Sequence, residues 1–139
     1  MHNKVIPVAV GILMNEAGHV LLNTRPRGKS FAGYWEFPGG KIQSHETPVA
    51  ALKRELMEEI GIVIQNAQLW KMETFCYPRH TTVQLYFFLI NNWQGTPVAQ
   101  EKQLLSWQNP QNLTVSPILE ANIALMKDLT PGLFKLHRA

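Results

Sequence analysis

Three glutamates crowd one turn of a segment with helical periodicity. Glu55, Glu58 and Glu59 stand at positions i, i+3 and i+4, so their side chains would share one helix face. Like charges at this spacing repel, and no lysine or arginine lies four residues after any of the three to offset the repulsion. Crowded carboxylate oxygens suit Mg²⁺ or Mn²⁺, but an acidic face in contact with solvent shows the same pattern. The residues alone leave both interpretations open.

The segment that carries these glutamates is predicted to be a helix of about three turns. Thr47 suits the N-cap, Pro48 the first helical position and Gly61 the C-terminal stop. Apolar residues recur at helical spacing along it: Val49, Leu52, Leu56 and Ile60. This apolar stripe lies beside the glutamate face, so the carboxylates should emerge along the edge where the helix meets a sheet.

Arg54 precedes this glutamate group. It neighbours Glu55 in sequence but is predicted to point away from it, and it could pair with Glu58 four residues later. An ordinary ion pair on a helix surface, which stabilises a fold very little, would show the same spacing.

The remaining elements follow from changes in periodicity and from turn residues. A loop is expected over residues 25–33, a tight glycine turn over 38–40 and another turn over 91–95. Ser116-Pro117 is predicted to begin a second helix that covers residues 118–129. Strands are expected over residues 5–14, 20–24, 35–37, 62–75, 81–90 and 104–107. The order predicts one α/β (α+β) domain over residues 1–139, with a mixed sheet between two helices.

The composition is that of an ordinary globular chain. Apolar residues make up 45% of the 139 residues and charged residues 17%, and the net charge is +3. A mild positive charge fits a phosphate-bearing small molecule, while the absence of a dense basic run argues against a nucleic-acid polymer. Cys76 is the single cysteine, so no internal disulfide can form, and the apolar run at 5–14 is too short to span a membrane. We expect a cytoplasmic monomer.

A longer pattern includes the glutamate helix. Gly40, Glu46, the run Arg54-Glu55-Leu56, the pair Glu58-Glu59 and the pair Gly61-Ile62 reproduce G-x5-E-x7-R-E-U-x-E-E-x-G-U, in which U is an aliphatic residue. Every specified position matches, so the chain resembles the Nudix hydrolases. The resemblance implies the Nudix fold, a bound Mg²⁺ or Mn²⁺, and hydrolysis of a nucleoside diphosphate linked to a further group. It also implies the ligand set, which is Glu55, Glu58, Glu59 and the backbone carbonyl of Gly39. Arg54 would orient a glutamate, and Glu46 and Gly40 would have supporting roles.

Further matches are similar to the MutT group of this family, which converts 8-oxo-dGTP to its monophosphate and pyrophosphate and thereby protects the nucleotide pool from mutagenic precursors. They are residues 35–41, Arg79-His80 and residues 93–95. This likeness implies that Glu101 is an additional metal-binding or base glutamate; the base could be Glu55 or Glu101. It implies that the nucleotide is bound by Arg25, Glu36, Phe37, Pro38, Gly39, Arg79 and Asn122.

Asn122 lies within the apolar stripe of the predicted second helix, beside Ile118, Leu125 and Leu129. A buried asparagine needs partners. It could bond to backbone groups inside the core, or its amide could read the edge of a base. The resemblance favours base reading, although Glu120 replaces the proline of the family's pattern.

Two loop positions differ from the MutT pattern. Ser30 stands where the group has a histidine, and Pro78 replaces an aspartate beside the loop arginine. Two alternatives therefore stay open. One is a Nudix enzyme for another triphosphate, such as CTP or dGTP. The other is a non-catalytic module that binds nucleotide, which we would expect to have lost glutamates that this chain retains.

Overall fold

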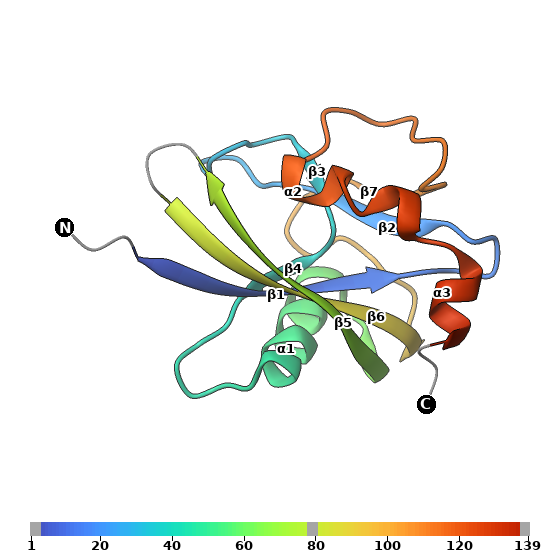
Figure 1. Ribbon diagram of the computed structural model, residues 1–139, viewed down its shortest axis with the longest axis horizontal. Coiled ribbons are helices and arrows are strands. Elements are labelled where there is room, and N and C mark those ends of the chain that lie inside the picture. Colours follow the sequence, from blue (N-terminus) through green and yellow to red (C-terminus); the bar gives the residue numbers. More distant parts are fainter. Residues whose placement is uncertain (1–3, 78–80, 137–139) are drawn as a thin grey trace.

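The computed structural model describes residues 4–77 and 81–136, which form two sheets and several helices (Figure 1). The four-stranded sheet has the order β4-β1-β6-β5, and the three-stranded sheet has the order β3-β2-β7. The elements are β1 Val5–Leu13, β2 Val20–Thr24, β3 Trp35–Glu36, β4 Gly39–Lys41, α1 Pro48–Ile60, β5 Val63–Tyr77, β6 Thr81–Gln94, β7 Leu105–Gln108, α2 Glu120–Ile123, the 3₁₀ turn η2 Met126–Asp128 and α3 Pro131–Leu136.

The larger sheet mixes parallel and antiparallel pairs. Strand β1 runs parallel to β6 and antiparallel to β4, and β5 and β6 form a long antiparallel pair. The mixed α+β arrangement is therefore as predicted, but the strands divide between two sheets instead of one. Strand β6 also extends to Gln94, through most of the turn expected at 91–95, and Gly95 follows it with a positive φ.

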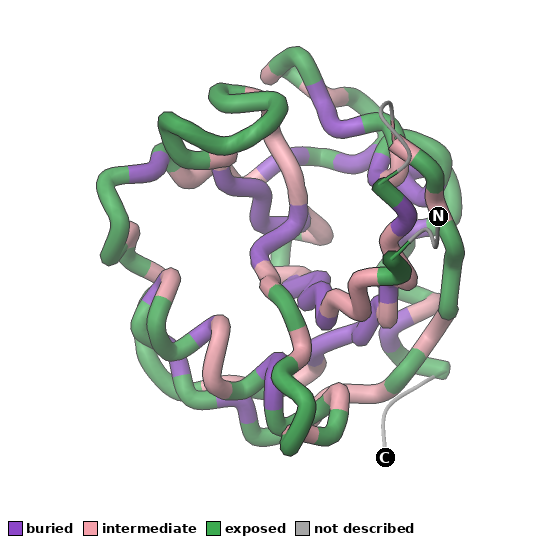
Figure 2. Tube along the Cα trace, turned by 90° about the vertical axis from the view of Figure 1, so that its left-hand side faces the viewer, coloured by how far each residue is buried: buried purple, intermediate pink, exposed green. Residues whose placement is uncertain are grey.

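Two groups of buried residues fill the interior. One lies between the sheets and α1, and it includes Leu21, Leu52 and Phe88. The other lies between the sheets and the C-terminal segment, and it includes Leu22, Phe87 and Leu129. Adjacent residues of one strand thus serve opposite cores, as the alternation of side chains along a strand requires. Figure 2 shows the buried residues on the inner traces and exposed residues on the outer loops.

Helix α1 begins and ends at the predicted residues. Thr47 Oγ1 accepts a hydrogen bond from the Ala50 N–H, and Gly61 adopts the left-handed conformation that ends the helix. The predicted apolar stripe is wrong at one position, because Val49 in the first turn is 38% exposed. Burial begins at Ala51, two residues further into the helix.

The predicted helix over 118–129 is wrong. The Trp35 N–H donates to the Pro117 carbonyl, and the Leu119 N–H donates to the Trp35 carbonyl, so residues 117–119 are extended alongside β3. The Pro117 carbonyl and the Leu119 N–H are therefore bonded to β3, and helical bonding begins only at the Leu119 carbonyl, which accepts from the Asn122 and Ile123 N–H groups. Ser116 is consequently not an N-cap, and α2 is only four residues long. None of the described helices has the length and apolar content needed to cross a membrane.

Candidate active site

Strand β4 brings two glycines against α1. The Gly39 N–H donates a hydrogen bond of 3.0 Å to Glu59 Oε2. A Cβ atom at Gly39 would overlap the carbonyl oxygen of Ala9 on β1, and a Cβ atom at Gly40 would overlap the Glu55 carboxylate. Glycine at these two positions therefore allows α1 to set two carboxylates directly against the β4 backbone.

The three helix glutamates occupy different environments. Glu55 and Glu59 follow the buried Ala51 at i+4 and i+8, so they face the sheet. The side chain of Glu58 is 55% exposed and contacts Arg54 at 3.4 Å. The structure brings Glu55 and Glu59 together beside Gly39 and Gly40, and it places Glu58 on the outer side of the helix.

Arg54 is bound to several of these groups at once. Its Nε and Nη2 atoms contact the two carboxylate oxygens of Glu46 at 2.6 and 2.8 Å, and Nη2 also donates to the Lys41 carbonyl. The prediction that Arg54 points away from Glu55 is wrong, because Nη1 contacts Glu55 Oε1 at 2.9 Å. Arginine has a long side chain, so its guanidinium can reach the carboxylate of the next residue although the two Cβ atoms point in different directions. The hydrogen bonds from Arg54 hold the pKa of Glu46 down at about 2, and they raise the pKa of Arg54.

Glu59 lies at the centre of the negative charge. Burial is the largest of the effects that raise its pKa to about 9; the charges of Glu55, Glu36 and Glu101 contribute to the rise, and the hydrogen bond from the Gly39 N–H opposes it. Four carboxyl groups from α1, β3 and the loop before β7 therefore lie within electrostatic reach of one another. A cation is the natural partner for such a group of hard oxygens.

A nearby buried oxygen is consistent with a hydrated cation. Asn23 pairs with Glu36 in the register of β2 and β3. It is 3% exposed, and its Oδ1 has no hydrogen-bond partner among the described residues. A water molecule held by a cation would supply the missing donor. In the described part of the chain, no three acidic, histidine or cysteine groups are already gathered as a ligand set. The donor chemistry fits a divalent cation, and the side chains would close around it.

The backbone of Glu101 is connected to Glu59 through Gln103, a residue that the sequence analysis did not identify. The Glu101 N–H donates to Gln103 Oε1 at 2.9 Å, and Gln103 Nε2 donates to the Glu59 carbonyl at 2.9 Å. Polar residues in a loop carry no periodic signal, so only the fold could identify Gln103.

Arg25 forms an ion pair with Glu36, whose charge is felt by Glu59. Arg25 Nη1 lies 3.0 Å from Glu36 Oε1, and Arg25 Nε donates to the carbonyl of Ser30. Burial raises the pKa of Glu36, while Arg25 and Lys29 lower it. Ser30 thus contacts the predicted nucleotide arginine through its backbone, a contact that does not depend on the side chain at this position.

Asn122 and Phe37 are joined directly. Asn122 Oδ1 accepts a hydrogen bond of 2.9 Å from the Phe37 N–H, and both residues are buried. Of the two interpretations left open for Asn122, bonding to backbone is correct for its oxygen. Its amide nitrogen donates to no group in residues 4–77 and 81–136, so two N–H donors are available to a ligand. Pro38 is also buried, and its carbonyl accepts from the Gly11 N–H.

A group of aromatic rings lies within electrostatic reach of the Arg25–Glu36 pair. The Tyr77 ring lies 5.5 Å from Phe31 and 4.6 Å from Phe75, measured between ring centroids. Burial is the main effect that raises the pKa of Tyr77 to about 12; the charges of Glu36 and Glu120 contribute to the rise, and the charge of Arg25 opposes it. The sequence prediction did not include these rings. Arg79 and Pro78 lie outside the described residues.

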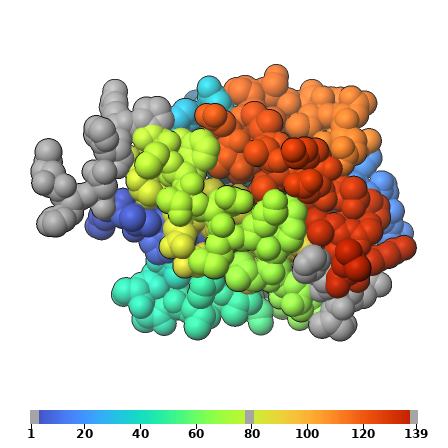
Figure 3. Space-filling view, viewed as in Figure 1, coloured from blue at the N-terminus to red at the C-terminus, as the bar shows by residue number. Residues whose placement is uncertain are grey.

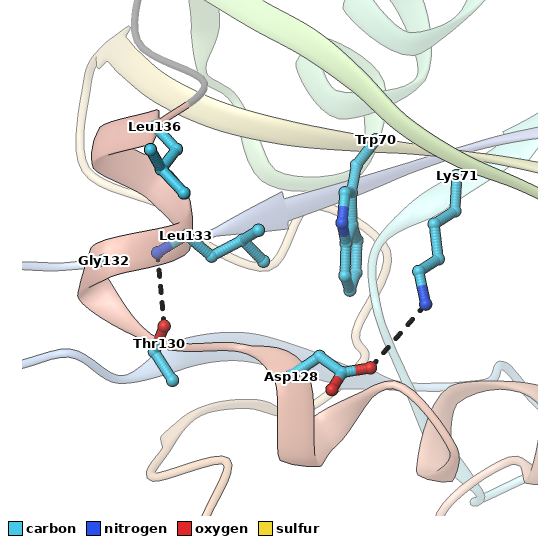
Figure 4. A pocket seen from close by; sticks show the side chains of 7 residues that line it. All are labelled: Trp70, Lys71, Asp128, Thr130, Gly132, Leu133 and Leu136. Atoms are coloured by element: carbon cyan, nitrogen blue, oxygen red, sulfur yellow. Dashed lines mark hydrogen bonds and ion pairs between the residues drawn. The ribbon is translucent and has the colours of Figure 1, made fainter.

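A separate pocket of about 670 Å³ lies between β5 and the C-terminal segment (Figure 4). Lys71 Nζ stands 3.6 Å from Asp128 Oδ2 and 4.8 Å from the centroid of the Trp70 ring. Figure 3 shows the C-terminal segment packed beside β5 on this face. None of the predicted site residues lines this pocket.

Residues 5–129 match the NUDIX domain. The chain belongs to the NUDIX family. An 8-oxo-dGTP diphosphatase of Haemophilus influenzae is 43% identical over 129 residues, which cover 93% of this chain and 94% of the relative. A CTP pyrophosphohydrolase of Escherichia coli is 32% identical, with 89% of this chain and 90% of the relative covered.

Solved structures agree with this assignment. A structure from a study of MutT from Aliivibrio salmonicida and Vibrio cholerae aligns with a TM-score of 0.72 and 31% identity, covering 91% of this chain and 97% of that chain. The predicted NUDIX fold and the resemblance to the MutT group are thus confirmed. Enzymes of the NUDIX hydrolase family act on phosphoric anhydrides and generally need divalent metal ions.

Proposed function

We propose that this NUDIX protein hydrolyses 8-oxo-dGTP to 8-oxo-dGMP and pyrophosphate, and so removes a mutagenic precursor from the nucleotide pool. The observation that carries the reaction type is the group of carboxylates around Glu59, set against the glycines of β4. The substrate rests on the relative named 8-oxo-dGTP diphosphatase, which is 43% identical along almost the whole chain.

Divalent metal would be held by the carboxylates of this site. Glu55 and Glu59 lie beside the β4 glycines and would be ligands, together with the Gly39 carbonyl. Glu58 and Glu101 would complete the ligand set. Bound Mg²⁺ or Mn²⁺ would neutralise phosphate oxygens and lower the pKa of a bound water. We favour Mg²⁺ and keep Mn²⁺ as an alternative.

The chain's own residues position the reacting groups. Arg54 holds Glu55 Oε1 at 2.9 Å and is itself held by Glu46, so the Glu55 carboxylate has a defined orientation. A water molecule attacks the β-phosphorus, the bond between that phosphorus and the bridging oxygen of the α-phosphate breaks, and nucleoside monophosphate and pyrophosphate leave. Glu55 or Glu101 would accept the proton of that water.

The base would bind near Asn122 and Phe37. The bond to the Phe37 N–H holds the Asn122 amide in one orientation and leaves its nitrogen as the donor. An oxidised guanine offers carbonyl oxygens as acceptors, so it would suit this donor. Arg25 and Arg79 would contact the nucleotide, with Glu36 orienting Arg25.

Another triphosphate is the second candidate, because a relative named CTP pyrophosphohydrolase is 32% identical. Steady-state rates with 8-oxo-dGTP, dGTP and CTP separate the two. A non-catalytic nucleotide-binding module is the third, and Glu55→Gln and Glu59→Gln test it, since an enzyme would lose most turnover while it stays folded. The monomeric state and the cytoplasmic location predicted from the sequence stay predictions, as does a single domain over residues 1–139.

A further inference from the structure

A loop segment, residues 98–103, is attached to the C-terminal end of α1. The Val98 N–H donates to the Ile60 carbonyl at 3.0 Å, and the Gln100 N–H donates to the Glu59 carbonyl at 2.9 Å. The last carbonyls of a helix have no partner within the helix, so these bonds satisfy groups that otherwise need solvent. The 98–103 segment therefore follows any movement of the end of α1 that carries Glu59.

Gln103 adds a side-chain connection to this attachment. It is only 8% exposed, and its amide bonds two backbone groups at once: Nε2 donates to the Glu59 carbonyl, and Oε1 accepts from the Glu101 N–H. Both ends of the amide are satisfied in this orientation, so the direction of the side chain is defined. One buried glutamine thus joins the metal-site helix to the residue that carries the Glu101 carboxylate.

The backbone between them is held in an unfavourable conformation. Lys102 has a φ of 63°, in the left-handed region that residues with a Cβ atom rarely adopt. This turn allows the Gln103 side chain to reach back to the N–H of the residue two positions earlier. The conformation persists because the surrounding bonds hold it.

The charge of Glu101 lies within electrostatic reach of Glu59. Glu101 is one of the charges that raise the pKa of Glu59, although its own residue is exposed and lies in a loop. An exposed glutamate has many rotamers and a mobile backbone, so holding it near the helix requires a support such as Gln103.

We propose that Gln103 is a positioning residue, which holds Glu101 beside Glu59 and thereby sets the affinity of the site for a divalent cation. The inference rests on the proposed metal site. It assigns Gln103 a role distinct from helix capping alone, because capping would stabilise the fold without acting through Glu101.

A double-mutant cycle on Mn²⁺ binding tests this directly, with affinity measured by calorimetry or by the electron paramagnetic resonance of free Mn²⁺. Gln103→Met keeps the volume of the side chain but removes both hydrogen bonds. We expect it to weaken Mn²⁺ binding about tenfold, as the loss of a residue that orients a ligand does. In the Glu101→Gln background the same change should alter the affinity less than about twofold, because the residue being positioned has lost its charge.

Gln100→Met is the matched control. Gln100 lies in the same segment, and its amide donates only to the exposed Val98 carbonyl. It should leave Mn²⁺ affinity unchanged. If Gln103→Met is too unstable for titration, Gln103→Asn replaces it, since the shorter amide cannot span both backbone groups.

Three results would overturn the inference: Gln103→Met weakens Mn²⁺ binding equally in both backgrounds, changes it in neither, or Glu101→Gln has no effect on binding. Turnover of 8-oxo-dGTP by the unaltered protein is measured separately. If the two substitutions are coupled in their effect on Mn²⁺ binding but the unaltered protein does not turn over 8-oxo-dGTP, the role of Gln103 is supported and the proposed function is contradicted. If the protein turns over 8-oxo-dGTP but the two substitutions have additive effects on Mn²⁺ binding, the proposed function is supported and the role of Gln103 is contradicted.

Discussion

Arg54 donates two hydrogen bonds, of 2.6 and 2.8 Å, to Glu46, one to each oxygen of the carboxylate. The paired geometry needs a planar guanidinium. The third nitrogen of Arg54 lies 2.9 Å from Glu55 Oε1, so Glu46 is connected through Arg54 to a candidate metal ligand.

Arg54→Lys should therefore lower kcat about 10- to 100-fold, because an ammonium group cannot hold Glu46 and Glu55 together. The free energy of unfolding should change by less than about 1 kcal/mol, since partly exposed ion pairs contribute little. Steady-state kinetics and urea unfolding give the two numbers. Lys53→Ala on the same helix serves as the control, and full turnover by Arg54→Lys would contradict the orienting role.

The two glycines of β4 should respond differently to alanine. In Gly40→Ala the new methyl meets the Glu55 carboxylate, which can rotate away, so the protein should fold but bind Mn²⁺ at least about tenfold more weakly. In Gly39→Ala the methyl meets the Ala9 backbone, which cannot move without breaking the sheet, so the melting temperature should fall sharply. Gly132→Ala, which adds its methyl in ordinary van der Waals contact with Thr130 Oγ1, is the control. Equal Mn²⁺ affinity in Gly40→Ala and the parent would rule out this packing argument.

The metal-free protein should lose stability as the pH rises. Glu59 has an ordinary pKa of 4.5 and a folded-state pKa of about 9, so the folded chain keeps a proton that the unfolded chain releases. This contribution is complete below the lower value and is lost as the pH rises through the higher one. Urea unfolding in the presence of a chelator at pH 5, 7 and 9 measures it. Glu59→Gln should flatten the slope between pH 5 and 9, and an unchanged slope would show that another group is responsible.

Two substitutions of Asn122 can separate its effect on stability from its effect on base recognition. Asn122→Asp keeps an oxygen for the Phe37 N–H but removes the amide donors, so it should fold normally and lose about tenfold of the preference for 8-oxo-dGTP over dGTP. Asn122→Ala also leaves the buried Phe37 N–H unpaired and should cost about 1–3 kcal/mol of stability. The ratio of kcat/KM values and the melting temperature report the two effects. A preference retained by both variants would exclude base reading by Asn122.

Local signals predicted α1 well. Thr47, Pro48 and Gly61 mark its ends through their own backbone chemistry, and the glutamates repeat within one turn. The same approach failed at residues 118–129, because the segment before α2 pairs with Trp35, which lies more than eighty positions earlier in the chain. No periodicity reports a partner at that distance.

The candidate site also has features that local sequence signals predict and features that depend on long-range contacts. The sequence identifies the types of residue, but the difference between the inward Glu59 and the outward Glu58 depends on where β4 lies. The sequence did not identify Gln103, because its partner Glu59 is 44 positions away and its neighbours form a loop. Long-range backbone contacts, which only the fold defines, decide which polar side chains act together.

The central claim is the substrate, and a single competition experiment tests it most directly. Equimolar 8-oxo-dGTP, dGTP and CTP are mixed with the protein and Mg²⁺, and the three monophosphates are followed over time by chromatography. We predict that 8-oxo-dGMP and pyrophosphate form first, with a kcat/KM advantage of at least about 100-fold, because a buried donor left unpaired by the wrong base is costly. Consumption of dGTP or CTP at an equal or greater rate would contradict the account.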